Sequence, residues 1–277
     1  MALRFAQVDV FSPEPLRGNP VAVVLDADGL DDAAMAAFAR WTNLSETTFV
    51  LAPTVPGADY RLRIFTPSTE LPFAGHPTLG TAHAWLEAQG GSAADRERVV
   101  QECGAGLVEV RRRGGVLAFA APPRIRTGPV DRAEVAEVAR GLCIDPGDVV
   151  AAEWVDNGPG WMALLLPSAD AVLAARPIFD DLRVGIAGPH PPGSEAALEV
   201  RAFFGAEGVG FEDPVTGSFN AGLAQWLLES GRISVPYVAA QGTVLGRTGR
   251  VHVDQDADGT VWVGGATTTV VRGELVL

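Results

Sequence analysis

Two stretches of the chain repeat one pattern: ELPFAGHPTLG at residues 70–80 and EDPVTGSFNAG at residues 212–222. Both fit E-x-P-x-x-G-x-x-x-x-G. Each copy follows a strand-like run that contains Arg-x-Phe, at 63–65 and 201–203, and each leads into a run with helical spacing. A match of strand, turn and helix in the same order indicates an internal duplication, with one such unit in each half of the chain.

The middle glycine of each copy, Gly75 or Gly217, opens the predicted helix. Glycine permits a tight turn and a close approach of a ligand. The first N–H groups of a helix lack intrahelical partners and carry the positive end of its dipole, so they favour a carboxylate or phosphate. Two such ends facing each other would hold one small anion in a cleft between the halves. Alternatively, the polar residues and glycines only cap and pack a helix.

The composition limits the classes of partner. The chain has 277 residues, 47% of them hydrophobic, and a formal net charge of −13. It can bury the core of one large domain or two small ones, and its acidity argues against nucleic acid or an anionic membrane surface. No window approaches the ~18 apolar residues of a membrane span. The first residues alternate like a strand and do not resemble a signal peptide, so we expect a cytoplasmic protein.

The residue types also exclude several chemistries. All 21 basic residues are arginine, which excludes pyridoxal phosphate catalysis, Schiff-base chemistry and a P-loop, because each needs a lysine. Cys103 and Cys143 lack CxxC spacing and are expected to be reduced, buried thiols. The four histidines are scattered and lack the spacing of a zinc site. We therefore expect no metal and no cofactor.

Strands are predicted to dominate, because most apolar runs are short, alternating and rich in β-branched residues. A helix is predicted at 31–43, where acidic residues open the run and Met35, Phe38 and Trp41 share one face. The Pro- and Gly-rich stretch at 121–129 is the candidate domain boundary.

Side chains that differ between the two copies are candidates for chemistry. His76 stands where Ser218 does, and Leu71 where Asp213 does, so the cleft would hold His76 from one half and Asp213 with Ser218 from the other. Glu46 lies between the predicted helix and a strand. A carboxylate at the edge of an apolar strand is desolvated, which raises its pKa and suits proton transfer. A solvated surface glutamate is the other reading, and the residues alone do not choose between them.

Three stretches resemble the signature blocks of the phenazine-biosynthesis isomerase family, called PhzF-like: NLSETTFV, RIFTPSTELPFAGHPTLGTAH and EDPVTGSFNAGLAQWL. RGNPVAVVLDADGL at 17–30 and the run at 241–253 also fit, so the resemblance covers nearly the whole chain. That family resembles diaminopimelate epimerase in fold. The resemblance implies an α+β protein with two pseudo-symmetric halves, each a mixed, mostly antiparallel barrel-like sheet around a central helix.

The predicted halves follow from this fold and the candidate boundary. The N-terminal half is expected to span 1–122 and to include a C-terminal strand at 268–277, and the C-terminal half to span 123–267. The resemblance places the active site in the cleft between them. It also implies a homodimer, since relatives are generally dimeric.

The resemblance assigns roles to the candidate residues. The family's acid/base glutamate maps onto Glu46, and its partners onto His76, Asp213 and Ser218. It implies a cofactor-free proton shift within a small anionic unsaturated amino acid such as dihydro-3-hydroxyanthranilate. Asp213 and His76 would hold the substrate's amine and hydroxyl or relay protons. Ser218 and the amides of the two helix ends would bind the carboxylate.

Further substrate-binding residues are expected at the two helix entrances: Gly75, Pro77, Gly217, Phe219 and Asn220. The phenazine enzymes have other residues where this chain has Phe219 and Asn220. Phe219 would narrow the pocket and Asn220 could add a hydrogen bond, which leaves the substrate open.

Two alternatives to the isomerase remain. One is an epimerase or lyase that acts on a hydroxylated amino acid and uses Asp213 as a second base beside Glu46. The other is a catalytically silent protein that binds small carboxylates. Racemisation by two thiols is excluded, because neither helix entrance carries a cysteine. In each case the expected partner is a small anionic ligand and not nucleic acid or a membrane.

Overall fold

The computed structural model describes residues 2–91, 95–178, 183–206 and 209–277. Contacts within the chain divide it into two compact units. Unit 1 comprises residues 1–120 and 264–277, and unit 2 comprises residues 121–263. Sequence analysis places the corresponding boundaries after residues 122 and 267. Sheets with few helices make up both units, so the predicted α+β class is confirmed.

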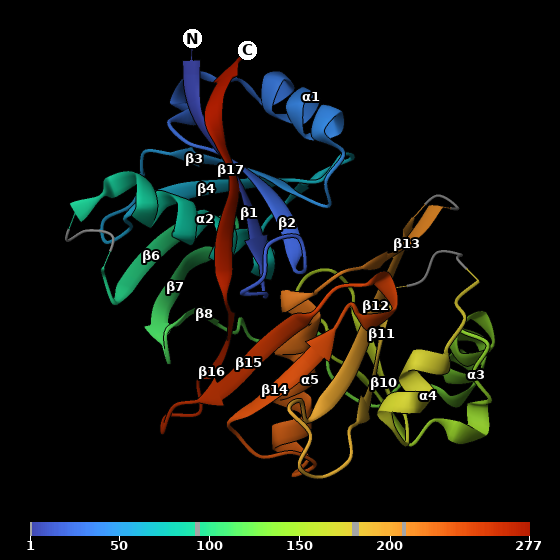
Figure 1. The fold of residues 1–277 in the computed structure, drawn as a ribbon. Coiled ribbons are helices and arrows are strands. Elements are labelled where there is room, and N and C mark those ends of the chain that lie inside the picture. Colours follow the sequence, from blue (N-terminus) through green and yellow to red (C-terminus); the bar gives the residue numbers. More distant parts are fainter. Residues whose placement is uncertain (1, 92–94, 179–182, 207–208) are drawn as a thin grey trace. The chain divides into compact units, whose positions relative to one another are not determined.

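Unit 1 is built on one mixed sheet (Figure 1). Its strands pair in the order β17–β1–β2–β3–β4–β6–β7–β8, and β5 also pairs with β4. The β2–β3 and β4–β6 pairs are parallel and the others antiparallel. The strands are β1 (Ala2–Val10), β2 (Asn19–Val24), β3 (Thr47–Leu51), β4 (Tyr60–Phe65), β5 (Glu70–Leu71), β6 (Arg98–Cys103), β7 (Gly106–Arg113), β8 (Val116–Ala120) and β17 (Thr267–Val276).

The helix α2 (Gly75–Gln89) is the central element of unit 1. It contacts β1, β2, β3, β6, β8 and β17, and its residues are buried on every side over the first turns. A helix enclosed in this way has no polar face to present. Gly80, the last glycine of the first motif copy, allows the close approach: a Cβ there would lie 2.4 Å from Val21 Cγ1 on β2.

Unit 2 contains a second mixed sheet, with the order β9–β10–β11–β12–β14–β15 and β13 also on β12. The β10–β11 and β12–β14 pairs are parallel. The strands are β9 (Ala151–Trp154), β10 (Met162–Leu165), β11 (Arg183–Pro189), β12 (Leu198–Ala206), β13 (Val209–Asp213), β14 (Tyr237–Gln241) and β15 (Gly249–Gln255). A further strand, β16 (Val261–Gly265), crosses the boundary between the units in the sequence.

The two sheets repeat one series of pairings, which confirms the internal duplication. The run β1–β2–β3–β4–β6–β7 and the run β9–β10–β11–β12–β14–β15 share the same alternation of antiparallel and parallel neighbours. The helix α5 (Gly217–Glu229) follows β13 as α2 follows β5. It is buried along its first eight residues, and a Cβ on Gly222 would lie 2.2 Å from the Val155 carbonyl oxygen.

Shorter helices lie outside the central ones. α1 (Asp32–Thr42) follows β2, α3 (Arg132–Gly141) precedes β9, and α4 (Ala169–Ala174) follows β10. α1 packs on the sheet through Met35 and Phe38, as predicted. Trp41 does not complete that buried face: it stacks on Phe38 with ring centroids 6.0 Å apart but is 80% exposed.

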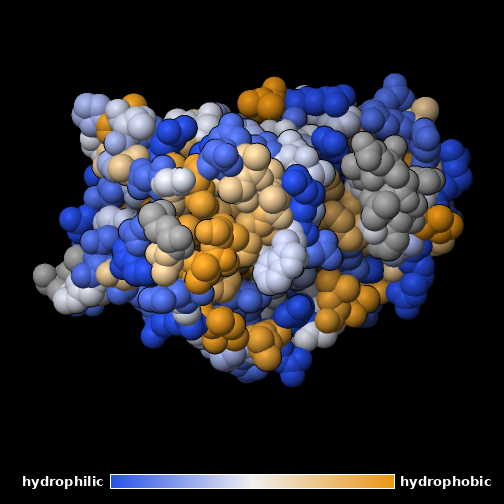
Figure 2. Space-filling view, turned by 90° about the horizontal axis from the view of Figure 1, so that it is seen from above, coloured by the Kyte–Doolittle hydropathy of each residue, from blue (hydrophilic) through white to orange (hydrophobic). Residues whose placement is uncertain are grey.

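The surface corrects one expectation about the cysteines. Both are free, as predicted, but Cys143 is exposed and Cys103 only half-buried. On the face shown in Figure 2, apolar side chains gather in separate areas with hydrophilic side chains between them. Within the described ranges, no helix has the length and apolar character needed to cross a membrane.

Candidate active site

The two central helices begin differently from the outer ones. α1, α3 and α4 each start at a side chain, Asp31, Asp131 or Ser168, that accepts a hydrogen bond from a first-turn N–H group. The corresponding residues of α2 and α5, Ala74 and Thr216, are themselves described and make no such side-chain bond. The first N–H groups of α2 and α5 are therefore left for another acceptor, which is the arrangement of an anion-binding helix end.

Gly75 and Gly217 are the first residues of these helices, and neither has a positive φ. The sequence suggests that these glycines are needed for a tight turn, but their backbone conformation does not require glycine. Pro77, the third residue of α2, has no N–H group, so the first turn of α2 offers the amides of Gly75 and His76.

Glu46 and His76 meet in unit 1. Glu46 precedes β3, and His76 is the second residue of α2. Glu46 Oε2 lies 3.4 Å from His76 Nε2, and the two side chains are 15% and 4% exposed. The structure thus brings together two of the predicted catalytic residues, from segments 30 positions apart in the sequence. A carboxylate beside a buried imidazole can take up and release a proton under the control of that ring.

A turn between β1 and β2 supports the other side of the imidazole. The buried Asp9 carboxylate accepts hydrogen bonds from the backbone N–H groups of Arg17 and Gly18, both at 2.9 Å. The turn delivers Asn19, whose Nδ2 lies 3.3 Å from His76 Nδ1. Sequence analysis did not select Asn19, although it lies in the RGNP run of the family resemblance.

Burial governs the protonation of His76. Desolvation lowers its pKa to about 3, and a hydrogen bond with the Pro20 backbone opposes this shift only in part. The ring is therefore neutral at neutral pH and carries one N–H. Pro20 has no backbone N–H group, so this one N–H donates to the Pro20 carbonyl oxygen. The neutral ring therefore forms no salt bridge with the Glu46 carboxylate that lies beside it.

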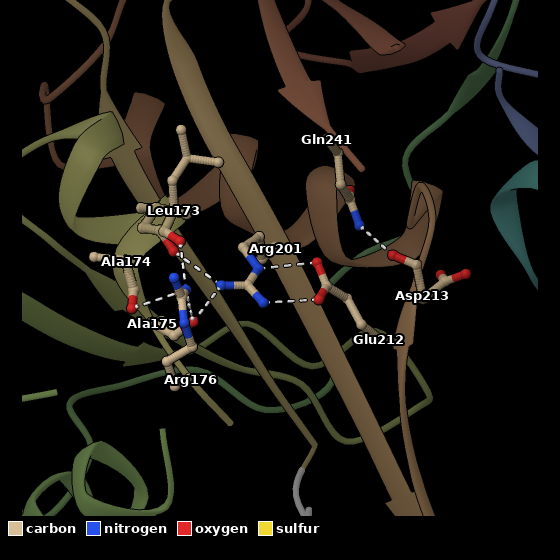
Figure 3. Close-up of polar contacts among 9 residues, drawn as sticks. Leu173, Ala174, Ala175, Arg176, Arg201, Glu212, Asp213 and Gln241 are labelled. Carbon is tan, nitrogen blue, oxygen red and sulfur yellow. Dashed lines mark hydrogen bonds and ion pairs between the residues drawn. The ribbon is translucent and has the colours of Figure 1, made fainter. Parts of the chain in front are cut away.

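Asp213 lies at the entrance of α5 in unit 2. It is the last residue of β13, and its Oδ2 accepts a hydrogen bond of 2.6 Å from the Thr216 hydroxyl. Its backbone carbonyl accepts a bond of 3.1 Å from Gln241 Nε2. In Figure 3 the Glu212 side chain points toward Arg201, whereas the Asp213 side chain points away from it. Neighbouring residues of a strand alternate in this way, so the two carboxylates of the motif have separate surroundings.

Glu212 belongs to a buried ion pair. Arg201 donates to both of its carboxylate oxygens, at 2.9 and 2.8 Å, and their side chains are 3% and 6% exposed. Arg201 also donates to the carbonyls of Val172 and Ala175 at the end of α4 (Figure 3). This bidentate arginine–glutamate pair, called the fork below, connects α4 to the strand pair β12–β13 and holds the strand that carries Asp213.

The same fork occurs in unit 1. Arg63 donates to Glu70 at 2.8 and 2.7 Å and also to Asp32, in the first turn of α1. In each unit the arginine lies 5.0 Å from the ring centroid of the Phe two residues later. The Arg-x-Phe and Glu elements of the duplicated motif are therefore explained as a structural clamp. The first clamp is more exposed than the second, since the Glu70 side chain is 42% exposed.

Two buried glutamines support the helix entrances. Gln241 on β14 accepts from the Thr216 N–H group at 3.0 Å and from Asn220 Nδ2 at 2.9 Å. Gln101 on β6, the strand that corresponds to β14, donates to the Thr78 hydroxyl at 3.1 Å. Thr78 and Asn220 are both the fourth residue of their helix, so the support is duplicated as well. Asn220 is expected to bind substrate, but its side-chain amide nitrogen donates to Gln241 within unit 2.

The next residues of α5 contact the segment 155–161. Ser218 accepts two hydrogen bonds from it, described below. Phe219 is fully buried, and a Cβ added to Gly185 would meet its ring at 2.1 Å. The expectation that the Phe219 side chain narrows a pocket is therefore corrected: the ring fills the core of unit 2, and only its backbone N–H belongs to the helix entrance. Among the described residues, no cluster of His, Cys, Asp and Glu is suited to a metal ion.

Comparisons with known proteins agree with the observed fold. The sequence matches the family described as phenazine biosynthesis-like protein (PhzC-PhzF) over residues 8–273. It is 38% identical to antisense-enhancing sequence 1 of Schizosaccharomyces pombe, over 98% of this chain and 97% of that protein. It is 38% identical to trans-2,3-dihydro-3-hydroxyanthranilate isomerase of Pseudomonas aeruginosa, over 92% and 91% of the two. A PhzF family protein of Bacillus anthracis shares the fold, with a TM-score of 0.83 over 100% of both chains at 21% identity.

Proposed function

The chain belongs to the phenazine biosynthesis-like family, and several of its relatives are named isomerases; we propose that it is a cofactor-independent isomerase that uses Glu46 as general acid and base. The proposed reaction moves a proton within a small anionic unsaturated amino acid of the dihydro-3-hydroxyanthranilate type. The observation that carries the proposal is the contact of 3.4 Å between Glu46 and the buried imidazole of His76.

One group, the Glu46 carboxylate, is enough to carry out both proton transfers of this reaction. The Glu46 carboxylate takes a proton from a substrate carbon and becomes the carboxylic acid, while the electron pair of the broken C–H bond shifts into the unsaturated system. The acid exchanges its proton with the solvent and then delivers one to another carbon, and Glu46 is a carboxylate again. A positioned general base of this kind contributes about 10²–10⁴-fold to the rate. Neutral His76 lies beside the carboxylate throughout.

Substrate binding is assigned to the helix entrances. The uncapped N–H groups at the starts of α2 and α5 are suited to the substrate carboxylate, and we include Ser218 as a further donor to it. Asp213 is the group suited to the substrate's amine or hydroxyl.

The chain offers a matched pair of variants to test the base. Glu46→Gln keeps the shape of the side chain but cannot accept the proton, so we expect turnover of trans-2,3-dihydro-3-hydroxyanthranilate to fall at least about 100-fold. Binding of anthranilate, a stable aromatic carboxylate, is expected to change little. Glu87→Gln is the control, because Glu87 also lies 3.4 Å from a histidine, His83, but on a later turn of α2.

The outcomes separate the competing functions. Full turnover in Glu46→Gln would refute the base assignment. Exchange of a substrate proton with inversion at one carbon would favour an epimerase with Asp213 as the second base. Anthranilate binding without exchange of any carbon-bound proton in candidate substrates would favour a silent binding protein.

A further inference from the structure

A short loop between β9 and β10, the segment DNGPGW at 156–161, is built to a fixed shape. The Asp156 carboxylate accepts hydrogen bonds from the N–H groups of Gly158 at 2.7 Å and Gly160 at 2.6 Å. Both glycines have a positive φ, of 140° and 92°. Backbone conformations of this kind favour glycine, so the sequence of the loop specifies its conformation.

The fixed loop directs two donors to one residue of α5. Asn157 Nδ2 donates to the Ser218 carbonyl oxygen at 2.9 Å, and Trp161 Nε1 donates to the Ser218 hydroxyl oxygen at 3.0 Å. Asn157 and Trp161 are 8% and 3% exposed, and Ser218 is 7% exposed. Asn157 Oδ1 is buried and accepts no hydrogen bond from the described residues. The bond from Nδ2 to Ser218 therefore sets the orientation of the Asn157 side chain.

The bond from Trp161 settles the direction of the Ser218 hydroxyl. An indole N–H is only a donor, so the hydroxyl oxygen must accept, and the hydroxyl proton must point to a different acceptor. Among the described residues, the side chains that bond Ser218 are Asn157 and Trp161, and both donate to it, so neither accepts the hydroxyl proton. At the second residue of a helix whose N–H groups are uncapped, such a proton is suited to an anion.

We infer that Asn157 and Trp161 are positioning residues that present the Ser218 hydroxyl as a hydrogen-bond donor to the substrate carboxylate. Trp161 orients the hydroxyl, and Asn157 fixes the backbone that carries it. This inference rests on the proposed function, because it takes Ser218 to contact the substrate. It extends the binding site to a loop outside the duplicated motif.

Trp161→Phe tests the inference, because it removes the N–H donor and keeps an aromatic ring beside Phe219, whose centroid lies 5.6 Å away. We expect the dissociation constant of anthranilate, measured by calorimetry, to rise about two- to tenfold, which corresponds to one neutral hydrogen bond. KM should rise by a similar factor with kcat nearly unchanged. Trp262→Phe is the control: Trp262 is also buried and its indole donates to Asp256 at 2.8 Å.

A double-mutant cycle separates orientation of the hydroxyl from general packing. If Trp161 acts through Ser218, then Trp161→Phe adds nothing to the weaker binding of Ser218→Ala. A purely structural role would lower Tm and leave the anthranilate affinity of the folded protein unchanged. Unchanged affinity in Trp161→Phe, or additive losses in the double variant, would overturn the inference and leave Glu46 untouched. Absence of anthranilate binding to the wild-type protein would overturn it together with the carboxylate site.

Discussion

Replacing Glu212 by glutamine removes one charge from the buried fork with Arg201 and leaves the guanidinium in place. The two side chains are 6% and 3% exposed, so water cannot solvate the arginine that remains. Breaking a buried pair by removing one partner costs about 3–5 kcal/mol of stability, because an uncompensated charge stays inside. The carbonyls of Val172 and Ala175 still accept hydrogen bonds from Arg201 but carry no full charge.

The duplication supplies a matched control in unit 1. Glu70→Gln makes the same change in the corresponding fork, but the Glu70 side chain is 42% exposed and Arg63 keeps its contact with Asp32 at 2.5 Å. An exposed ion pair contributes about 0.2–1 kcal/mol. We therefore expect the loss in Glu212→Gln to exceed that in Glu70→Gln by about 2 kcal/mol or more.

Urea unfolding monitored by tryptophan fluorescence and by circular dichroism measures both variants against the wild type, with the free energy taken from the midpoint and slope. Coincident transitions of the two probes are needed first, since a chain with two units can unfold in steps. Equal losses in the two variants, or a loss below about 1 kcal/mol in Glu212→Gln, would refute the argument that burial decides the strength of the fork.

Two further results are expected. Stability should fall as the pH falls from about 6.5 toward 3, because His76 binds a proton in the unfolded chain at its ordinary pKa of 6.5 but in the folded protein only near 3. His76→Asn should flatten this part of a pH titration of the unfolding free energy, and an unchanged slope would contradict the lowered pKa. Gly222→Ala should cost about 1–3 kcal/mol by overpacking against Val155, whereas Gly273→Ala, with nothing within 4 Å of the added Cβ, should cost little. Equal thermal shifts in the two alanine variants would contradict the packing argument.

The fold could be predicted as far as the motif copies reach. The repeated E-x-P-x-x-G-x-x-x-x-G pattern predicted a duplicated strand–turn–helix unit, because the start of a helix and its close packing depend on residues that are near in the sequence. The pairing order of the strands was beyond such reasoning, since parallel pairs such as β4–β6 join segments with a helix between them. Trp41 was misplaced because a helical pattern shows which residues share a face but not where the sheet beneath that face ends.

The site shows the same limit. His76 was selected from the duplicated motif and Glu46 through the family resemblance, and their contact depends on two segments that meet only in the folded unit. Asn19, Gln241 and Trp161 were not selected as site residues, because each acts through hydrogen bonds to residues tens of positions away in the sequence. Phe219 was misread, since its position beside Ser218 in the sequence says nothing about the core that its ring fills.

The most direct measurement of the central claim follows deuterium in the substrate. The protein is incubated in D₂O with trans-2,3-dihydro-3-hydroxyanthranilate, and carbon-bound deuterium is located by NMR and mass spectrometry. Our account predicts deuterium at a carbon of the product in the wild-type protein and in Glu87→Gln, with none above the uncatalysed background in Glu46→Gln. Equal incorporation in Glu46→Gln and the wild type would contradict the claim that this carboxylate carries the proton.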